Sequence, residues 1–257
     1  MSVRRARFDV GNEAEIDIAT TSGEIVVTEG DPGVVEVAID GAEDAVAETE
    51  IYETGAVVVV KAKSQRRWFS RRVDARITVP PGARASLRTA SGDIHVPVRL
   101  SEADVNLAAG DLRLSDVSGP VRVRSVTGDV LIGNCGGVLR ISSASGDVRV
   151  DRAGAEATID SASGDVIVDV ASGTIEVRTA AGDVAIRRFE GQRLIGKSMS
   201  GDFSIGVVPG LELDVDIQTL SGEFRNQLPP PGDAEPAARA TIFIKTLSGD
   251  VIFRSAG

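Results

Sequence analysis

The segment Ser145-Gly146-Asp147-Val148-Arg149-Val150 returns 18 residues later as Ser163-Gly164-Asp165-Val166-Ile167-Val168. Glycines keep the same spacing over a longer stretch, at positions 92, 110, 128, 146, 164 and 182. A fixed period of this length is typical of solenoids, in which a repeat cannot bury its apolar face alone and stacks on its neighbours. The sequence therefore predicts an all-β fold, a single-stranded β-solenoid with 18-residue coils.

The repeat has a half-period and an irregular end. Glycines at 119, 137, 173, 191 and 210 lie nine residues after a motif glycine, so each coil divides into two nine-residue strand–turn halves. The last copies, at Gly201, Gly222 and Gly249, are spaced by 19, 21 and 27 residues, which predicts insertions and irregular C-terminal coils. An outlying copy, Ser22-Gly23-Glu24-Ile25, lies near the start.

Apolar and polar residues alternate within each coil. The positions two, four, eleven and thirteen after Gly128 hold Val130, Ile132, Leu139 and Ile141. Period-two alternation places such residues on one face of each strand. The positions between them are mostly polar, with Leu131 and Ile167 as exceptions. We expect two main sheets around a thin aliphatic core, although a three-sided coil also fits 18 residues.

The first 89 residues lack the 18-residue spacing. They contain short apolar runs separated by turn signals such as Asp31-Pro32-Gly33, which are typical of strands. We predict an N-terminal antiparallel β cap over residues 1–89 and a solenoid over residues 90–257, together forming one continuous elongated domain. Residues 41–50 fit either a short helix or a polar loop.

The Ser-Gly-Asp copies between Ser91 and Val251, preceded by Ile77-Thr78-Val79-Pro80, resemble the bacterial putative-adhesin β-strand-repeat family with its toastrack-like domain. That domain has no known function. The resemblance implies a non-enzymatic β-solenoid, a structural or protein-interaction module, in some members tied to cell-envelope stress systems.

An aspartate follows most motif glycines, and two interpretations of this column are open. Stacked carboxylates could form a cation-binding ladder. Alternatively, glycine supplies positive φ and aspartate accepts hydrogen bonds from nearby turn amides. We favour the turn interpretation and predict neither a metal nor a cofactor. The structural turn residues are Gly92, Asp93, Gly110, Asp111, Gly128, Asp129, Gly146, Asp147, Gly164, Asp165, Gly182, Asp183, Gly201, Asp202, Gly249 and Asp250.

The segment from Ser64 to Arg72 is the compositional anomaly, because it is basic and aromatic in a chain of net charge −10. Basic residues interleaved with rings are typical of contacts with an anionic membrane surface or an acidic partner. A hairpin loop whose rings cover the sheet is the alternative. The net charge argues against nucleic acid. The candidate contact residues are Arg66, Arg67, Trp68, Phe69, Arg71 and Arg72.

Catalytic groups are scarce in this sequence. His95 lies between two inward-facing residues and is predicted to face solvent, and Cys135 is predicted to lie in a turn. We therefore predict no enzyme, since a general base needs a positioned partner and a pocket. A β-helix carbohydrate-active enzyme would need clustered carboxylates, which the repeats do not supply.

The partner that we expect is a protein of unknown identity, and the alternative is self-assembly into dimers or filaments through solenoid ends or faces. The N-terminal residues lack the apolar run of a secretory signal, and no apolar run approaches the ~20 residues of a membrane span. The sequence therefore predicts a cytoplasmic protein.

Overall fold

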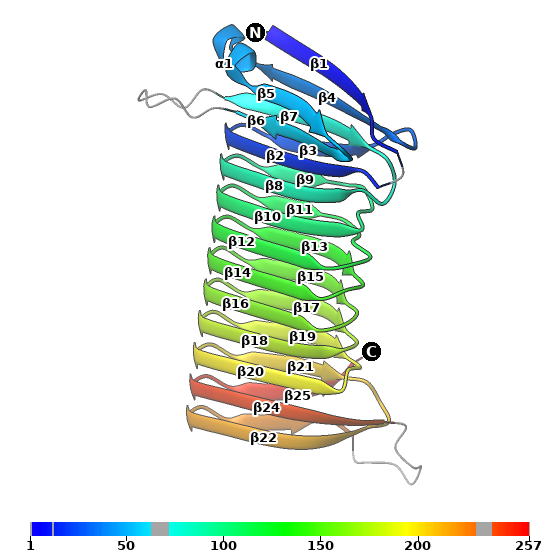
Figure 1. Cartoon of the computed structure of the whole chain (residues 1–257). Coiled ribbons are helices and arrows are strands. Elements are labelled where there is room, and N and C mark those ends of the chain that lie inside the picture. Colours follow the sequence, from blue (N-terminus) through cyan, green and yellow to red (C-terminus); the bar gives the residue numbers. More distant parts are fainter. Residues whose placement is uncertain (1, 12, 63–71, 230–237, 257) are drawn as a thin grey trace. The chain divides into compact units, whose positions relative to one another are not determined.

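Strands dominate the computed structural model, which describes residues 2–11, 13–62, 72–229 and 238–256 (Figure 1). The chain divides into two compact units, unit 1 (Met1–Leu131) and unit 2 (Ile132–Gly257), and strand β13 (Val130–Cys135) spans the division. The all-β fold predicted from the repeat is confirmed.

Each S-G-D turn joins two strands that lie in different sheets. We call the sheet of the strands before the glycine the incoming sheet, and the sheet of the strands after it the outgoing sheet. Gly164 has φ of +113°, a conformation that residues with a Cβ rarely adopt. A Cβ at this position would also overlap the carbonyl oxygen of Gly146 on the neighbouring coil. Glycine is therefore required both by the turn and by the close stacking of the coils.

Two parallel sheets make up unit 2 as described. The incoming strands, in spatial order, are β14 (Leu139–Ser145), β16 (Ala157–Ser163), β18 (Thr174–Ala181), β20 (Arg193–Ser200), β24 (Ala238–Ser248) and β22 (Leu211–Ser221). The outgoing strands are β15 (Val148–Ala153), β17 (Val166–Ala171), β19 (Val184–Phe189), β21 (Phe203–Val207), β25 (Val251–Ser255) and β23 (Phe224–Gln227). Val148 pairs with Val166, one coil later, so the repeat period sets the register. The coils are two-sided.

The order of the last coils in unit 2 departs from the order of the chain. β24 pairs with β20 on one side and with β22 on the other. β25 likewise pairs with β21 and β23. The predicted irregularity is therefore a change of order, in which the coil made last lies between two coils made earlier.

Unit 1 combines parallel coils with an antiparallel end. Its incoming strands, in spatial order, are β12 (Val121–Thr127), β10 (Glu102–Ala109), β8 (Arg84–Ser91), β2 (Glu15–Ser22), β6 (Val57–Lys61) and β5 (Glu50–Thr54). Its outgoing strands are β11 (Leu112–Leu114), β9 (Ile94–Val96), β3 (Ile25–Glu29), β7 (Val73–Val79), β4 (Val34–Gly41) and β1 (Ser2–Asp9). The pairs β1–β4, β4–β7 and β5–β6 are antiparallel, which confirms the N-terminal antiparallel β cap.

Parallel stacking begins before residue 90. β2 pairs with β8, and β3 pairs with β9, so the outlying copy at Gly23 forms a coil in register with the regular ones. Residues 41–50, left open between helix and loop, contain the helix α1 (Glu43–Glu48). Among the described residues, no helix is long and apolar enough to cross a membrane.

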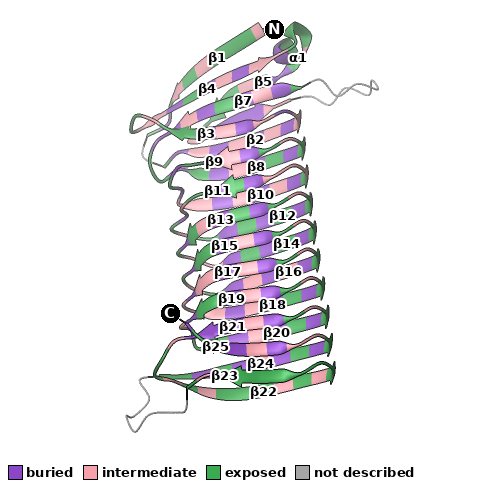
Figure 2. Cartoon of the chain, turned by 180° about the vertical axis from the view of Figure 1, so that it is seen from behind, coloured by how far each residue is buried: buried purple, intermediate pink, exposed green. Residues whose placement is uncertain are grey.

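The core lies between the two sheets. Figure 2 shows the buried inward positions as purple rows that run across neighbouring strands. The four inward positions predicted per coil are buried in the regular coils, for example at Val166 and Ile175. Two further positions are buried. Seven residues after the glycine lie Cys135, Ala153, Ala171 and Phe189, and fifteen residues after it lie serines and threonines such as Ser143 and Thr179.

Candidate functional site

The aspartates of the S-G-D turns accept hydrogen bonds from the backbone of the next coil. Oδ1 of Asp165 accepts the N–H of Asp183 at 2.9 Å, and the N–H of Asp165 donates to Oδ1 of Asp147 at 2.9 Å. In unit 1, the N–H of Asp111 donates to Oδ1 of Asp93 at 2.9 Å. The turn interpretation requires this geometry. Within the described ranges, no group of three or more His, Cys, Asp or Glu side chains is placed to hold a metal ion.

Buried hydroxyl groups lie three residues before the motif glycines. Thr179 is 6% exposed, and its Oγ1 donates to the carbonyl oxygen of Ala181 at 3.2 Å. Oγ1 of Thr246 donates to the carbonyl oxygen of Ser248 at 3.1 Å in the same way. Because side chains alternate along a strand and the hydroxyl residue points inward, the next residue, two before the glycine, points outward.

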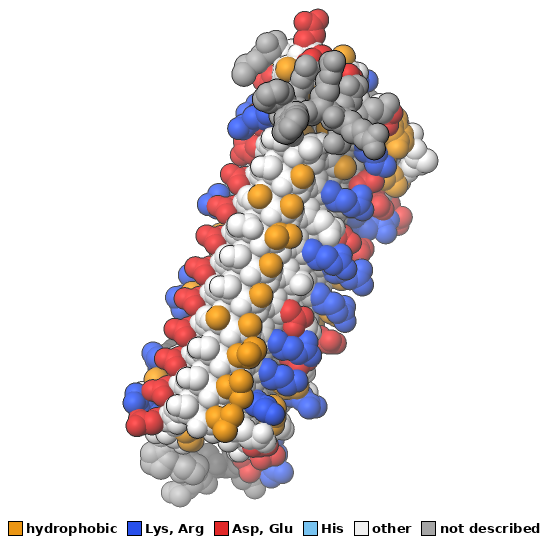
Figure 3. Space-filling model, turned by 90° about the vertical axis from the view of Figure 1, so that its left-hand side faces the viewer, with side chains coloured by type: hydrophobic (Ala, Val, Ile, Leu, Met, Phe, Trp, Pro, Cys, Tyr) orange, Lys and Arg blue, Asp and Glu red, His pale blue; other side chains and the backbone are white. Residues whose placement is uncertain are grey.

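That outward position carries an apolar column, which the sequence analysis missed. We define the turn-edge column as the residues two before the motif glycines of unit 2; in spatial order these are Ala144, Ala162, Ala180, Met199, Leu247 and Leu220. All six are exposed, and the three large ones, Met199 (59%), Leu247 (42%) and Leu220 (82%), occupy adjacent coils. Figure 3 shows hydrophobic side chains following one another along the turns.

Charges of opposite sign border the turn-edge column. One residue after the motif glycines, Asp202, Asp250 and Glu223 form its acidic flank. Four residues before the same glycines, Lys197 and Lys245 form its basic flank, with Gln218 on the terminal coil. Figure 3 shows a red row on one side of the apolar line and blue side chains on the other.

The two flanks also have charged neighbours within unit 2. Nζ of Lys197 lies 3.2 Å from Oε1 of Glu176. Nη2 of Arg225 lies 2.7 Å from Oε2 of Glu223 and 3.5 Å from Oδ2 of Asp250. Lys245 makes no ion pair with any residue that the structure describes.

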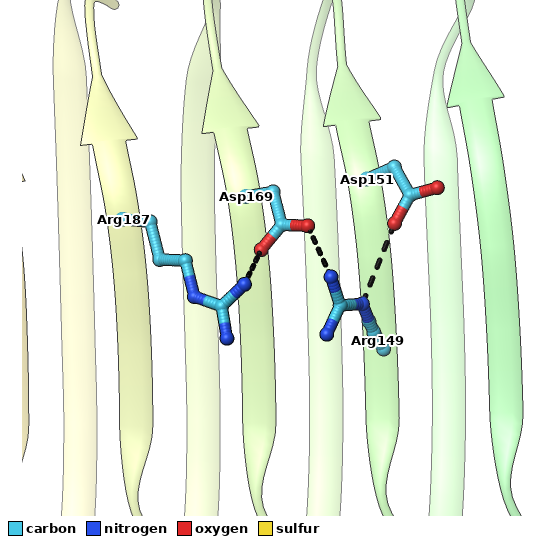
Figure 4. A network of polar contacts seen from close by, with 4 residues as sticks. All are labelled: Arg149, Asp151, Asp169 and Arg187. Carbon is cyan, nitrogen blue, oxygen red and sulfur yellow. Dashed lines mark hydrogen bonds and ion pairs between the residues drawn. The ribbon is translucent and has the colours of Figure 1, made fainter.

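The outer face of the outgoing sheet in unit 2 pairs its own charges. Asp169 accepts hydrogen bonds from Nη2 of Arg149 at 2.6 Å and from Nη1 of Arg187 at 2.8 Å (Figure 4). Arg149 also lies 3.4 Å from Asp151 through its Nε. Each exposed pair of this kind contributes only about 0–1 kcal/mol. The network pairs these charges with one another within the chain, and among the described residues this face offers no exposed apolar row of large side chains like Met199, Leu247 and Leu220.

The predicted contact segment lies almost wholly outside the described residues, since Arg66, Arg67, Trp68, Phe69 and Arg71 are not among them. Arg72 is described, and its Nε donates to Oδ1 and Oδ2 of Asp74 at 2.9 and 3.0 Å. Oδ1 of Asp74 accepts the N–H of Glu24 at 2.8 Å, the bond that motif aspartates make elsewhere.

The ends of that segment are nevertheless placed by the sheets of unit 1. β6, which precedes the segment, pairs with β2, and β7, which follows it, pairs with β3. The chain between Lys61 and Val73 therefore connects the same two sheets that Gly23 connects on the adjacent coil.

The two residues considered for catalysis do not form a site. His95 is half-buried on β9, between the buried Ile94 and Val96. Cys135 was predicted to lie in a turn, which is wrong. It ends β13 with 1% exposure, at the inward position that Ala153 and Ala171 occupy in later coils. Burial raises the pKa of the Cys135 thiol, although the hydrogen bond to Gly137 opposes this effect.

Two surface hollows lie in unit 1, with carboxylates such as Glu48 in one and Glu24 in the other. One is lined by Arg4 and residues 47–52. Another is lined by residues 22–24, Arg72 and residues 91–93. Neither lining includes a histidine or a cysteine. The turn-edge column of unit 2 is therefore the candidate functional site, and its chemistry is that of an interface.

Comparison with known proteins agrees with this fold. A family model described as Toastrack DUF4097 matches residues 14–253. No curated protein sequence matches the chain. The crystal structure of a putative adhesin from Bacteroides fragilis is 15% identical, with a TM-score of 0.55, and the match covers 98% of this chain and 97% of that chain. A putative lipid binding protein from Parabacteroides distasonis is 13% identical, covering 96% of both chains with a TM-score of 0.40.

Proposed function

Because the chain belongs to the Toastrack DUF4097 family, we propose that it is a non-enzymatic structural module that binds a protein partner. The structures compared above are described as an adhesin and a lipid-binding protein, not as enzymes. The candidate site supports the same class of function, since it offers an apolar surface with charged borders.

The turn-edge column of unit 2 is the observation that carries the proposal. Contiguous exposed apolar side chains mark interaction sites, because water contact with them is unfavourable. Met199, Leu247 and Leu220 supply such side chains on adjacent coils. Protein interfaces also combine an apolar centre with a polar rim, which the acidic and basic flanks provide here.

The stacking of coils suits this surface to binding. Neighbouring strands lie about 4.8 Å apart, and the strands that carry Met199 and Leu247, β20 and β24, are each paired with a strand on both sides. A surface held in its bound geometry loses little conformational freedom on association. The module would therefore act as a rigid scaffold.

Affinity capture from the native host tests the proposal. The bait proteins are the wild-type chain, a variant with Met199→Ser, Leu220→Ser and Leu247→Ser, and the control Leu131→Ser, which changes an exposed leucine outside the column. We expect at least one protein to bind the wild type and the control but not the triple variant. Equal capture by all three baits would overturn the assignment of this surface.

We propose a second contact in unit 1 for the Arg-Trp-Phe segment, the candidate contact residues Arg66, Arg67, Trp68, Phe69, Arg71 and Arg72. Its composition favours an anionic surface, either a membrane or an acidic protein. Binding to anionic lipid vesicles would be compared between the wild type and Trp68→Ala/Phe69→Ala. Loss of vesicle binding in the variant supports membrane contact, and absence of binding by the wild type excludes it.

We also propose a setting: the family resemblance suggests a scaffold linked to cell-envelope stress, and the sequence itself predicts a cytoplasmic location. Fractionation of host cells that express the full protein tests the location, and capture from stressed and unstressed cells tests the process. We expect the protein in the cytoplasmic fraction and a larger amount of captured partner after stress. Recovery outside the cytoplasm, or no change on stress, would contradict this setting.

A further inference from the structure

We propose that the turn-edge column of unit 2 binds a second copy of this chain, face to face, with both stacks running in the same direction. This inference rests on the proposed function and names its partner. The two-fold axis of such a dimer runs along the direction in which the coils stack. Each coil of one copy then lies opposite the same coil of the other copy.

The apolar residues favour a self-complementary contact. The three large side chains, Met199, Leu247 and Leu220, lie on adjacent coils, whereas the other three members of the column are alanines. Two copies that face each other can bury these large side chains against their counterparts. In this arrangement the alanines of one copy lie opposite the alanines of the other, so the apolar contact is made chiefly by the three large side chains.

The charges decide the direction of the two copies. When two identical faces meet with their stacks in the same direction, the acidic flank of each copy lies opposite the basic flank of the other copy. Asp250 of each copy then faces Lys245 of the other, and Asp202 faces Lys197. With the stacks reversed, acidic flank meets acidic flank and basic meets basic, which is repulsive. Opposite charges at the rim therefore favour the same direction.

The size of the surface predicts a weak dimer. Six coils span about 24 Å at the usual strand spacing, and the five residues from the basic to the acidic flank span about 15 Å. The resulting area of about 360 Å² per copy is smaller than the ~800 Å² per partner of stable complexes. We therefore expect the dimer to form reversibly and to depend on protein concentration.

Sedimentation velocity over a wide range of concentration tests dimer formation. We expect the sedimentation coefficient of the wild type and of Leu131→Ser to rise with concentration. The Met199→Ser/Leu220→Ser/Leu247→Ser variant should stay monomeric because it lacks the apolar centre. Lys197→Glu/Lys245→Glu should also stay monomeric, because it places acids opposite acids. All substituted residues are exposed, and circular dichroism melts check that each variant is folded.

Spin-label distances test the direction. The native cysteine is replaced by Cys135→Ala, matching Ala153 and Ala171 in the equivalent position, and a label is attached at Ala144→Cys or at Leu220→Cys. Stacks in the same direction give similar short distances between copies for both labels. If the two stacks instead run in opposite directions, with Leu247 of one copy opposite Leu247 of the other, the two labels at position 144 lie eight coils apart, about 38 Å.

A wild type that stays monomeric, a triple variant that still dimerises, or a long distance between labels at position 144 would each overturn the proposal. A monomeric wild type leaves the proposed function intact if capture from the host still yields another protein whose binding requires Met199, Leu220 and Leu247. Failure of the capture experiment with a confirmed dimer would instead make self-association the role of this surface.

Discussion

The backbone N–H of Asp250 donates a hydrogen bond of 2.7 Å to Oδ1 of Asp202, although 48 residues separate these two aspartates in the sequence. Oδ1 of Asp250 in turn accepts the N–H of Glu223 at 2.9 Å. The coil that the chain makes last is therefore held between two coils made earlier. This order leaves β22 and β23 as the terminal strands of unit 2, and it places Leu220 at the end of the turn-edge column.

Hydrogen exchange should report this order. β24 pairs on both sides, with β20 and β22, whereas β22 pairs with β24 alone. We expect backbone amides of β24 to exchange more slowly than those of β22, because an edge strand leaves half of its amides open to water. Mass spectrometry of the exchanged peptides gives both rates. Stronger protection in β22 than in β24 would indicate stacking in chain order.

The motif glycines should be far less replaceable than other glycines with positive φ. Gly164→Ala suffers about 1–3 kcal/mol of backbone strain, and its Cβ must also displace the backbone of Gly146. Gly210 has φ of +83° but no atom within 4 Å of an added Cβ, so Gly210→Ala suffers the strain alone. Urea denaturation should show a clearly larger loss of unfolding free energy for Gly164→Ala than for Gly210→Ala. Equal losses would mean that the coils are not packed as closely as described.

The aspartate column should act through its backbone hydrogen bond. Asp165→Ala leaves the N–H of Asp183 without this acceptor, and we expect a loss of about 1 kcal/mol. Asp165→Asn keeps an acceptor oxygen and should lose less. Calcium should not change the melting temperature. A calcium-dependent rise that Asp165→Asn abolishes would instead support the cation ladder.

Glu190 is expected to contribute to the stability of unit 2 in a pH-dependent way. Its carboxylate accepts a hydrogen bond of 2.8 Å from Oγ of Ser172, the main cause of its lowered pKa, and a second bond comes from Arg188. Because the pKa is lower in the folded state, the stabilisation is present above the ordinary glutamate pKa and is lost as pH falls through the lowered value.

Ser172→Ala should therefore destabilise unit 2 by at most about 1 kcal/mol near neutral pH, since the pair is only half-buried and water screens it. The difference from the wild type should vanish in acid. The control Ser204→Ala removes a hydroxyl that makes no hydrogen bond with the described residues, and it should show no such pH dependence. Urea midpoints across pH provide the measurement, and a Ser172→Ala effect that persists in acid would refute the assigned cause.

The regular coils could be predicted from the sequence, because glycine spacing fixes where each turn falls and alternation fixes which residues face inward. Val148 and Val166 occupy the predicted positions in register. The order of the last coils could not be predicted. The coils around Gly222 and Gly249 carry the same motif and present the same row of backbone hydrogen-bonding groups. The local sequence pattern therefore does not specify which of them lies beside the coil of Gly201.

The turn-edge column was missed for a different reason. Near the turn the usual polarity of a strand is reversed, since the hydroxyl of Thr179 points inward and the side chain of Met199 points outward. The apolar residues that stand out at outward positions in the sequence pattern are Leu131 and Ile167, which lie elsewhere on their coils. Extending the same alternation to the third and second residues before each motif glycine would have placed Met199, Leu220 and Leu247 on the surface. The composition of the Arg-Trp-Phe segment marks it in the sequence, whereas the sheets of the strands on either side of it, β6 and β7, are known only from their pairing.

Photo-crosslinking in the native host tests the central claim most directly, that the turn-edge column of unit 2 is where this protein meets its partner. A benzophenone side chain would replace Met199 in one variant and Leu131, an exposed leucine outside the column, in another. The account predicts a discrete crosslinked product from position 199, either a second copy or another protein, and none from position 131. Crosslinks from position 131 with none from position 199 would contradict it.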